Sequence, residues 1–471
     1  MKNDSENELA FLSIEEAARL LRRKSISPVE LTKAALARIE RWNPGLNAFI
    51  TVLGKRALRE AREAEREIAR GRRRGPLHGI PIALKDNFWT RGIRTTAGSK
   101  ILAEFVPKGN SDVAELLARA GAILLGKTNM HEFAYGITSD NPHYGPVRNP
   151  WAKDHIAGGS SGGSAVAVAT GMAFGATGTD TGGSIRIPSA LCGTVGLKPT
   201  MGLVSVAGVI PLAETFDHAG PIARNVTDAC ILLQAMMGRY PEKIAPPDYR
   251  KLRKNRAKRV RLGWPKQYFF DRVDQELSGI FEAARKEFVS TGALVEEVSL
   301  EKPAESAEPS TNIALAEATH YHKSMGYFPA RAAVYGEDVR QRLEMGEKIL
   351  AEDYLRAMAW MFELAAEFDK AFERFDAILA PASPIPAPRI GEKEVTIRGE
   401  RETVRSALVR LNRPANFTGH PAISVPCGFT RAGLPVGLQL IGPRFSEARL
   451  LAIASEYEDA TEWHKRRPSL D

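Results

Sequence analysis

Two clusters of glycine and serine, residues 158–164 and 179–188, carry the most suggestive chemistry in this sequence. A serine hydroxyl becomes a nucleophile when a neighbouring base takes its proton, so closely spaced serines suggest acyl transfer. Glycines beside them leave backbone N–H groups open to a ligand, because they lack a Cβ atom. Between the clusters, the apolar small residues 165–169 predict a buried helix and not a polar linker. We therefore expect two ordered loops that line a site.

A histidine base and a metal ion are both poorly supported as partners of these serines. Residues 158–162 fit the G-x-S-x-G pattern of α/β-hydrolases, but that fold also needs an acid and a late histidine. The late histidines are His420 and His464, and a core or surface role is the commoner one for such residues. His131 begins an H-E-x-x-H motif whose second histidine is absent from the sequence. We predict no metal site.

The remaining candidate base is Lys85. It lies near the end of the almost continuous apolar run of residues 79–87, which is typical of a strand buried on both faces of a parallel sheet. A lysine at that position either reaches solvent or is enclosed. Because the ordinary lysine pKa is about 10.4, a base that works near neutrality needs a pKa lowered by about 3 units through burial or nearby positive charge.

Residues 121–128 match the P-loop pattern G-x-x-x-x-G-K-[ST], which would imply nucleotide binding. That motif needs a glycine-rich phosphate loop between a strand and a helix. Here residues 122–125 are apolar and predict the strand itself, while Gly121 is placed to end the preceding helix. We therefore predict a strand and no nucleotide site.

The elements that must position these residues alternate between helices and strands. Ser13 and Ser27 each begin a Ser-x-x-Glu capping box, which predicts two N-terminal helices ending near residues 24 and 42. The rest of the chain predicts a single α/β domain with a mostly parallel, twisted mixed central sheet covered by helices on both faces.

Within this fold we expect an N-terminal helical segment, residues 1–60, to pack on a core domain of residues 61–460. Prolines and many basic residues at about 239–261 predict a variable surface region.

The composition is that of an ordinary soluble enzyme, with 44% hydrophobic and 26% charged residues. Three cysteines far apart in the chain predict free thiols in a reducing compartment. Because no signal-peptide segment or membrane span is evident, we expect a cytoplasmic protein without a membrane partner. The net charge is +9, and the basic stretches at residues 70–74 and 250–261 lack interleaved aromatic residues. We interpret them as solvated surface and do not expect a nucleic-acid partner.

The sequence resembles the amidase signature family. Residues 158–188 match the diagnostic pattern of that family almost throughout. Further blocks match at residues 81–87, 126–134, 196–200 and 435–439, and the resemblance covers about residues 63–445. The segment that imitates a P-loop is one of these family blocks.

The resemblance implies a serine–serine–lysine mechanism. Ser184 would be the nucleophile, Ser160 a bridging serine that follows a cis peptide bond, and Lys85 the base. Neutral Lys85 would accept the proton of Ser184 through Ser160 and return it to the leaving amine. The backbone N–H groups of an oxyanion hole would come from four consecutive residues: Thr181, Gly182, Gly183 and Ser184. Asp180 and Arg186 are expected to brace this loop.

By this resemblance we expect an amidase that hydrolyses a small-molecule carboxylic amide through an acyl-enzyme. Aryl amides, esters and carbamates (urethanes) share the tetrahedral path, and no cofactor is required. The substrate pocket would lie in the segments 130–144, 311–335 and 411–420. Five aromatic residues are candidates to line it: Tyr135, Tyr144, Tyr321, Phe328 and Tyr335. A homodimer is compatible with the sequence.

Two alternative functions remain open. The first is the glutaminase subunit of a tRNA-dependent amidotransferase, whose catalytic blocks are similar and whose basic stretches would meet partner subunits or tRNA. Against it, residues 208–212 and 412–419 look more like free-standing amidases. The acidic residue with which that subfamily holds the glutamine amine also has no evident match before Asn416. The second alternative is a non-catalytic binding or scaffold protein, which the intact Lys85, Ser160 and Ser184 argue against.

Overall fold

The computed structural model describes residues 8–238, 246–252 and 259–470. Within these ranges the centre of the molecule is an 11-stranded sheet. In spatial order its strands are β1 (Phe49–Val52), β3 (Ile123–Thr128), β2 (Pro81–Lys85), β6 (Gly175–Asp180), β8 (His218–Ala223), β7 (Val195–Lys198), β14 (Ala422–Phe429), β15 (Pro435–Ile441), β11 (Ala377–Pro381), β9 (Arg261–Trp264) and β10 (Leu294–Glu297). Two further pairs are β4 (Arg148–Asn149) with β5 (Ala152–Ile156), and β12 (Glu394–Ile397) with β13 (Glu400–Thr403).

Parallel pairing occurs in two blocks of this sheet. β2 pairs in parallel with β3 and β6, and β9 pairs in parallel with β10 and β11. From β6 through β8, β7, β14 and β15 to β11, each strand is antiparallel to the next, as is β1 to β3. The prediction of a single α/β domain with a mixed sheet is confirmed. Its parallel pairs are concentrated in the two blocks rather than spread across the sheet.

Helices cover both faces of the sheet. Along β2, Ile82 and Leu84 belong to one hydrophobic cluster and Ala83 to another, because successive side chains of a strand point to opposite faces. The helices are α2 (Ile14–Arg23), α3 (Pro28–Leu46), α4 (Gly54–Ala69), α5 (Asp112–Arg119), α6 (Gly162–Ala169), α7 (Arg186–Cys192), α8 (Val226–Met236), α9 (Tyr249–Leu252), α10 (Gln275–Ser290), α11 (Ala307–Ser324), α12 (Glu337–Gly346), α13 (Ala351–Phe372), α14 (Val404–Arg410), α15 (Arg413–Phe417) and α16 (Glu447–Ala460). The cluster that contains Ile82 includes side chains of α2, α5, α8, α10 and α16, and the cluster that contains Ala83 includes side chains of α3, α4 and α6.

The two predicted capping boxes are present. The Ser13 and Ser27 side chains each accept a hydrogen bond from the backbone N–H three residues later. The glutamate side chain at that position accepts a hydrogen bond from the backbone N–H of the same serine. The second helix continues to Leu46, past the predicted end near residue 42, with Pro44 inside its last turn. It stops where Asn47 adopts the left-handed conformation, with φ of 54°.

The prediction that residues 121–128 do not form a phosphate loop is confirmed. Gly126, Lys127 and Thr128 are paired and buried within β3. Lys127 Nζ lies 3.3 Å from a carboxylate oxygen of Asp86 and donates to the carbonyl oxygen of Phe88 at 2.8 Å. This lysine is therefore engaged inside the protein.

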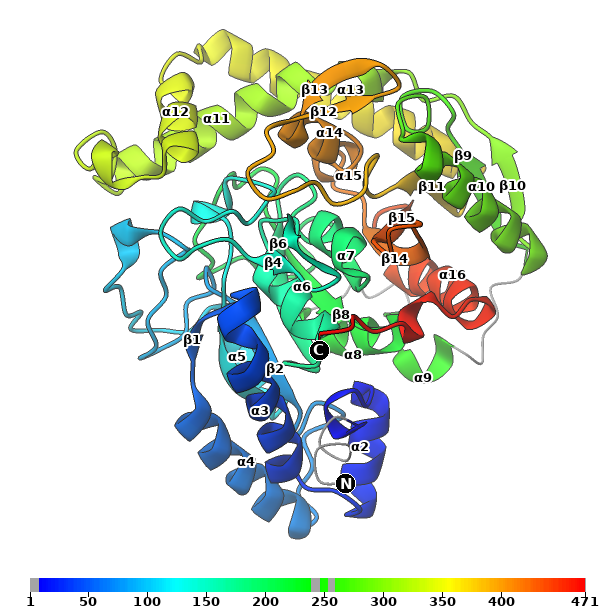
Figure 1. Ribbon diagram of the computed structural model, residues 1–471. Coiled ribbons are helices and arrows are strands. Elements are labelled where there is room, and N and C mark those ends of the chain that lie inside the picture. The colour runs from blue at the N-terminus through cyan, green and yellow to red at the C-terminus, as the bar shows by residue number, and fades with distance from the viewer. Residues whose placement is uncertain (1–7, 239–245, 253–258, 471) are drawn as a thin grey trace.

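The helices α11, α12 and α13 lie at one end of the molecule, close to α14 and α15, and α2, α3 and α4 lie at the opposite end (Figure 1). Between them are β6 and α7, which carry the second glycine–serine cluster. Of the surface region predicted at 239–261, residues 239–245 and 253–258 lie outside the described residues. No helix in the described part of the chain is long and apolar enough to cross a membrane.

Candidate active site

The three predicted catalytic residues come from neighbouring elements at one edge of the sheet. Lys85 is the last residue of β2, Ser160 lies just before α6, and Ser184 lies between β6 and α7. Because β2 and β6 are parallel neighbours, their carboxyl ends meet at the same edge, where α/β proteins commonly bind ligands. All three side chains are buried, and Ser184 retains 4% exposure.

Lys85 is enclosed and does not reach solvent. Its Nζ donates to Ser160 Oγ at 2.7 Å and to Thr179 Oγ1 at 2.6 Å. Burial lowers the pKa of Lys85 to about 7, against the opposing effect of the Asp217 and Asp180 carboxylates. This is the change that a lysine base working near neutrality requires, because the neutral amine is then substantially populated.

The first glycine–serine loop has the predicted backbone, since the Gly159–Ser160 peptide bond is cis. It contacts the second loop through the backbone, where the Ser161 N–H donates to the Ser184 carbonyl oxygen at 3.3 Å, and through the Ser161 hydroxyl, which donates to the Thr179 carbonyl oxygen at 3.3 Å. In the described structure no hydrogen bond joins the Ser160 and Ser184 hydroxyls. Catalytic hydrogen bonds are often long in a free enzyme and tighten only when substrate binds, so its absence does not rule out the predicted proton path.

The second loop is held by a fully buried ion pair between Asp180 and Arg186, with Nε 3.1 Å from Oδ2. Arg186 also donates to Gln439 at 2.8 Å and to Asn416 at 2.6 Å. Although burial opposes it, the Arg186 guanidinium and a hydrogen bond from Asn416 hold the pKa of Asp180 well below its usual range. The predicted bracing role of Asp180 and Arg186 is confirmed.

The same aspartate changes the predicted oxyanion hole. The Gly183 N–H donates to Asp180 Oδ1 at 2.6 Å, so it is not available to a developing oxyanion. Within the described residues, the N–H groups of Thr181, Gly182 and Ser184 have no hydrogen-bond acceptor. Thr181, Gly182 and Ser184 remain the candidate donors with free N–H groups, whereas the Gly183 N–H, also predicted as a donor, fixes the loop.

A pocket of about 490 Å³ opens beside Ser184. Thr181, Gly182 and Ser184 lie in its wall. The three segments predicted to form it contribute residues 134–137, residues 311, 314 and 315, and residues 413, 416 and 417. The sequence analysis missed the contributions of α12 and α14. Among the described residues, four charged side chains line the pocket: Asp338 and Arg342 from α12, Arg405 from α14 and Arg413 from α15. Three of these four are positive.

The predicted aromatic pocket is mostly core. Tyr135 lines the cavity, whereas Phe328 and Tyr335 are buried with it in a hydrophobic cluster against which Tyr321 packs. The hydroxyl of Tyr335 lies 2.8 Å from Nδ1 of His322. Tyr144 is not among the residues that line this pocket.

The histidines considered for other mechanisms have structural partners. His420 Nε2 lies 2.9 Å from Asp369, and His131 Nε2 lies 2.9 Å from Asp338. Among the described residues, no group of three or more histidine, cysteine, aspartate and glutamate side chains is arranged to hold a metal ion.

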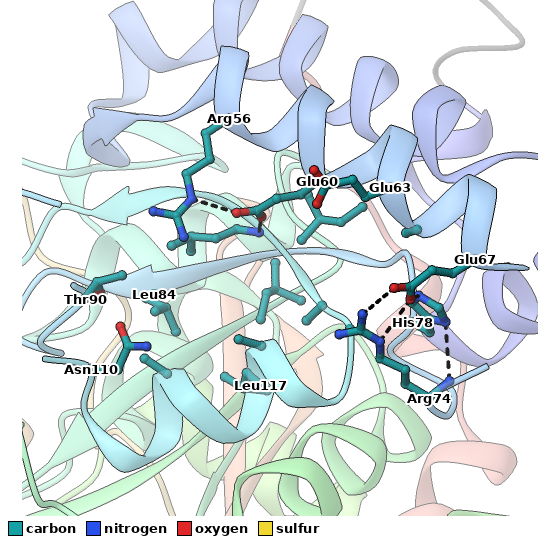
Figure 2. Close-up of a pocket in the computed structure, with 18 residues that line it drawn as sticks. Arg56, Glu60, Glu63, Glu67, Arg74, His78, Leu84, Thr90, Asn110 and Leu117 are labelled. Atoms are coloured by element: carbon teal, nitrogen blue, oxygen red, sulfur yellow. Dashed lines mark hydrogen bonds and ion pairs between the residues drawn. The ribbon is translucent and has the colours of Figure 1, made fainter. Parts of the chain in front are cut away.

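A second pocket lies between α4 and α5, with Glu60 and Glu67 on α4 and Leu117 on α5 (Figure 2). Its charges largely bond to one another. Glu67 is paired with Arg74 and lies 3.1 Å from His78, while Glu60 accepts from Arg56 at 2.6 Å. None of the predicted catalytic residues lines it, whereas Ser184 lines the pocket described above.

Comparison with known proteins agrees with this arrangement. A family model described as Amidase matches residues 30–451. The chain belongs to the amidase signature family. It is therefore an enzyme acting on carbon–nitrogen bonds of amides, as the sequence predicted.

Individual relatives of this chain include amidotransferase subunits and amidases. A glutamyl-tRNA(Gln) amidotransferase subunit from Moorella thermoacetica is 40% identical over 490 residues, with 98% of this chain and 99% of that protein covered. A crystal structure of an amidase superimposes with a TM-score of 0.87 and 36% identity, covering 95% of this chain and 99% of the other. The crystal structure of the corresponding glutamyl-tRNA(Gln) amidotransferase subunit from Thermotoga maritima gives a TM-score of 0.78 and 34% identity, with 96% of each chain covered.

These relatives correct two predictions. The main prediction, a free-standing amidase of small-molecule amides, is wrong, because proteins about 40% identical to this chain over nearly its whole length are amidotransferase subunits. The prediction of a small-molecule amide as the partner, without nucleic acid, is wrong for the same reason. The main prediction relied on the loops near residues 208–212 and 412–419, and short loops do not outweigh matches of this length and extent.

Proposed function

We propose that this chain is the glutamine-hydrolysing subunit of an amidotransferase that acts on glutamyl-tRNA, with Ser184 as nucleophile. The observation that carries the proposal is the 40% identity to a glutamyl-tRNA(Gln) amidotransferase subunit over nearly the whole of both chains. Such a match extends beyond the catalytic blocks that amidases share. The basic and exposed residues 70–74 are then a candidate contact for a partner subunit or for tRNA.

The proposed reaction is an acyl transfer in two steps. Ser184 Oγ attacks the side-chain amide carbon of glutamine, and its proton passes through Ser160 to neutral Lys85. Lys85 returns the proton to the leaving nitrogen, so that ammonia departs and a glutamyl ester remains on Ser184. Water then attacks the ester by the same proton path and releases glutamate.

Two features of the site support this mechanism. The 2.7 Å contact between Lys85 and Ser160 gives the proton acceptor a defined position at the start of the path. The N–H groups of Thr181, Gly182 and Ser184 lie beside the nucleophile, where they would stabilise the negative charge of the tetrahedral intermediate. Loss of one such donor typically costs about 3 kcal/mol of transition-state stabilisation.

The proposal is tested in a hybrid enzyme, in which this chain replaces the similar subunit of the Moorella thermoacetica amidotransferase. The hybrid is given glutamine and glutamyl-tRNA(Gln), and formation of glutaminyl-tRNA is measured. We expect glutamine-dependent product, and we expect the Ser184→Ala variant to lose it. Free ammonium in place of glutamine checks that the partner subunits are active in both hybrids.

Two results together would contradict the proposal. The first is a hybrid that uses ammonium but not glutamine. The second is an isolated chain that does not hydrolyse glutamine in a Ser184-dependent reaction.

A further inference from the structure

Asp217 is a buried carboxylate that lies beside the active site without a positive partner. It immediately precedes β8, whose first residue, His218, pairs with Asp180 at the end of β6, so it lies at the same edge of the sheet as Lys85. The residue is 7% exposed, and burial raises its pKa to about 6. Within the described parts of the chain it forms no ion pair. A buried carboxylate without a counterion costs free energy, so its bonds and its charge are expected to have a use.

The hydrogen bonds of Asp217 join the oxyanion loop to the wall of the pocket. Thr181 Oγ1 donates to Asp217 Oδ1 at 2.5 Å. The backbone N–H groups of Leu212 and Ala213 donate to Oδ2 at 2.8 Å and 3.2 Å. Thr181 and Leu212 both line the Ser184 pocket. The carboxylate therefore fixes a residue whose own N–H is a candidate oxyanion donor.

The negative charge of Asp217 also acts on Lys85. Burial lowers the pKa of Lys85, and the carboxylates of Asp217 and, to a smaller extent, Asp180 oppose that effect. Asp180 is neutralised by Arg186 in the buried ion pair. When Lys85 accepts the proton of the nucleophile, a positive charge develops in a buried site, and a nearby carboxylate stabilises it. Asp217 is placed to supply that stabilisation.

The other charged and titratable groups around Lys85 and Asp217 come from several elements: Asp86, Lys127, Asp180, Arg186, Lys198, His218 and Glu317. Asp86 is paired with Lys127 at 3.3 Å, as Asp180 is with Arg186. Lys198 Nζ donates to His218 Nε2 at 3.1 Å. Glu317 is half-buried and accepts from the Thr215 N–H at 3.0 Å. Among the described residues near Lys85, Asp217 is therefore the fully enclosed carboxylate whose charge no cation balances.

We propose that Asp217 is a positioning residue, which holds Thr181 of the oxyanion loop in place and stabilises the positive charge that develops on Lys85 during acyl transfer. The inference rests on the proposed function only in taking Ser184 as the nucleophile and Lys85 as the base. Because both effects belong to the transition state, loss of the carboxylate lowers kcat more than it raises KM. Removal of a nearby negative charge also disfavours the protonated amine, so the pH at which Lys85 becomes a base moves downward.

The test is the pH profile of Asp217→Asn, which keeps the shape of the side chain and removes its charge. We expect kcat for glutamine to fall about 10- to 100-fold, with KM within about threefold of the wild type. The midpoint of the kcat/KM profile should move from near pH 7 to about pH 6. The same profile is measured with a fluorophosphonate, whose phosphorus bonds to Ser184 Oγ as fluoride leaves and the hydroxyl proton passes to Lys85. This probe requires no particular amide.

Asp228→Asn is the matched control. Asp228 is also buried, has a pKa raised by burial to about 6, and accepts the Ile14 N–H at 2.9 Å at the start of α2. Its loss should lower stability without moving the midpoint. Thr181→Val removes the hydroxyl that Asp217 holds but keeps the charge, and we expect kcat to fall about tenfold at an unchanged midpoint. Asp217→Glu keeps the charge on a longer side chain and should also keep the midpoint.

An unchanged midpoint in Asp217→Asn, or an equal shift in Asp228→Asn, would overturn the proposal. If Asp217→Asn does not fold, the other two variants decide: a full rate in Thr181→Val or a downward shift in Asp217→Glu would overturn it. A chain that reacts with the fluorophosphonate but does not hydrolyse glutamine would contradict the proposed function and leave the predicted shift intact, so the two hypotheses are separable.

Discussion

Lys85 Nζ lies 2.7 Å from Ser160 Oγ, although the two residues are 75 positions apart in the chain. The contact arises because β2 ends at Lys85 beside β6, and the loop before α6 returns to the same edge of the sheet. Among the described residues, no charged partner neutralises the lysine by direct contact, and its bonds are to the hydroxyls of Ser160 and Thr179. The amine is therefore positioned as a proton acceptor and not as half of an ion pair.

The pH dependence of activity should follow the Lys85 amine. Burial lowers its pKa to about 7, so the neutral form dominates above that pH and the charged form below it. We expect kcat/KM for glutamine to rise with pH, to be half-maximal near pH 7, and to fall to about one tenth of its plateau near pH 6. A profile measured from about pH 5.5 to 9 checks this, and a flat profile would show that another group is the base.

Removal of Ser184 should abolish hydrolysis. Ser184→Ala deletes the nucleophile, and we expect kcat for glutamine to fall by about 10⁴-fold or more. Ser160→Ala breaks the proton path and should cause a loss of similar order, because residues that act as a unit are not additive. Ammonia release and rapid-quench detection of the acyl-enzyme measure both effects. Full turnover by Ser184→Ala would disprove the assignment.

Two adjacent glycines of the loop should respond differently to a methyl group. A Cβ at Gly183 would lie 2.6 Å from Asn412 Cβ, on a backbone with φ of +116°. A Cβ at Gly182 would meet Val409 at 3.5 Å, an ordinary contact. Gly183→Ala is expected to reduce kcat/KM at least about 100-fold by displacing the Ser184 loop, since small displacements at a reacting centre have effects of that order. Gly182→Ala should stay within about tenfold of the wild type, and similar losses in both would contradict the steric argument.

The buried pair of Asp180 and Arg186 should dominate local stability. Arg186→Met leaves the Asp180 carboxylate buried without its counterion, and we expect the free energy of unfolding to fall by about 3–5 kcal/mol. Urea denaturation monitored by fluorescence measures the change. The control is Arg356→Met, because Arg356 forms an exposed pair with Glu352 at 2.7 Å, and such pairs add little. Equal stability of the two variants would refute the structural role of Asp180 and Arg186.

Much of the fold and the catalytic centre could be predicted from the sequence because their signals are local. The capping boxes at Ser13 and Ser27 act over three residues and define where two helices begin. The apolar run that ends at Lys85 indicated a strand buried on both faces. The sequence left open whether Lys85 reaches solvent or is enclosed, and the structure encloses it, with a pKa lowered to about 7 by burial.

The function was the harder inference. The same serine–serine–lysine blocks occur in free-standing amidases and in amidotransferase subunits, so the catalytic residues alone do not separate the two. The sequence interpretation relied on short loops and chose the wrong member of the family, which the full-length comparisons corrected.

The sequence by itself determined the family, because the two glycine–serine loops and the strand that ends at Lys85 match its conserved blocks. The resemblance in turn predicts the chemistry at Ser184. Only the tertiary structure decided what surrounds that serine. Arg342 and Arg405 look like ordinary solvated residues of α12 and α14, and no local pattern marks them. In the folded chain both residues line the same cavity as residues 134–137. The Gly183 N–H is not available to a ligand in that cavity, because it donates to the Asp180 carboxylate. Charges and hydrogen bonds between residues far apart in the chain depend on distances in space, which a linear pattern does not contain.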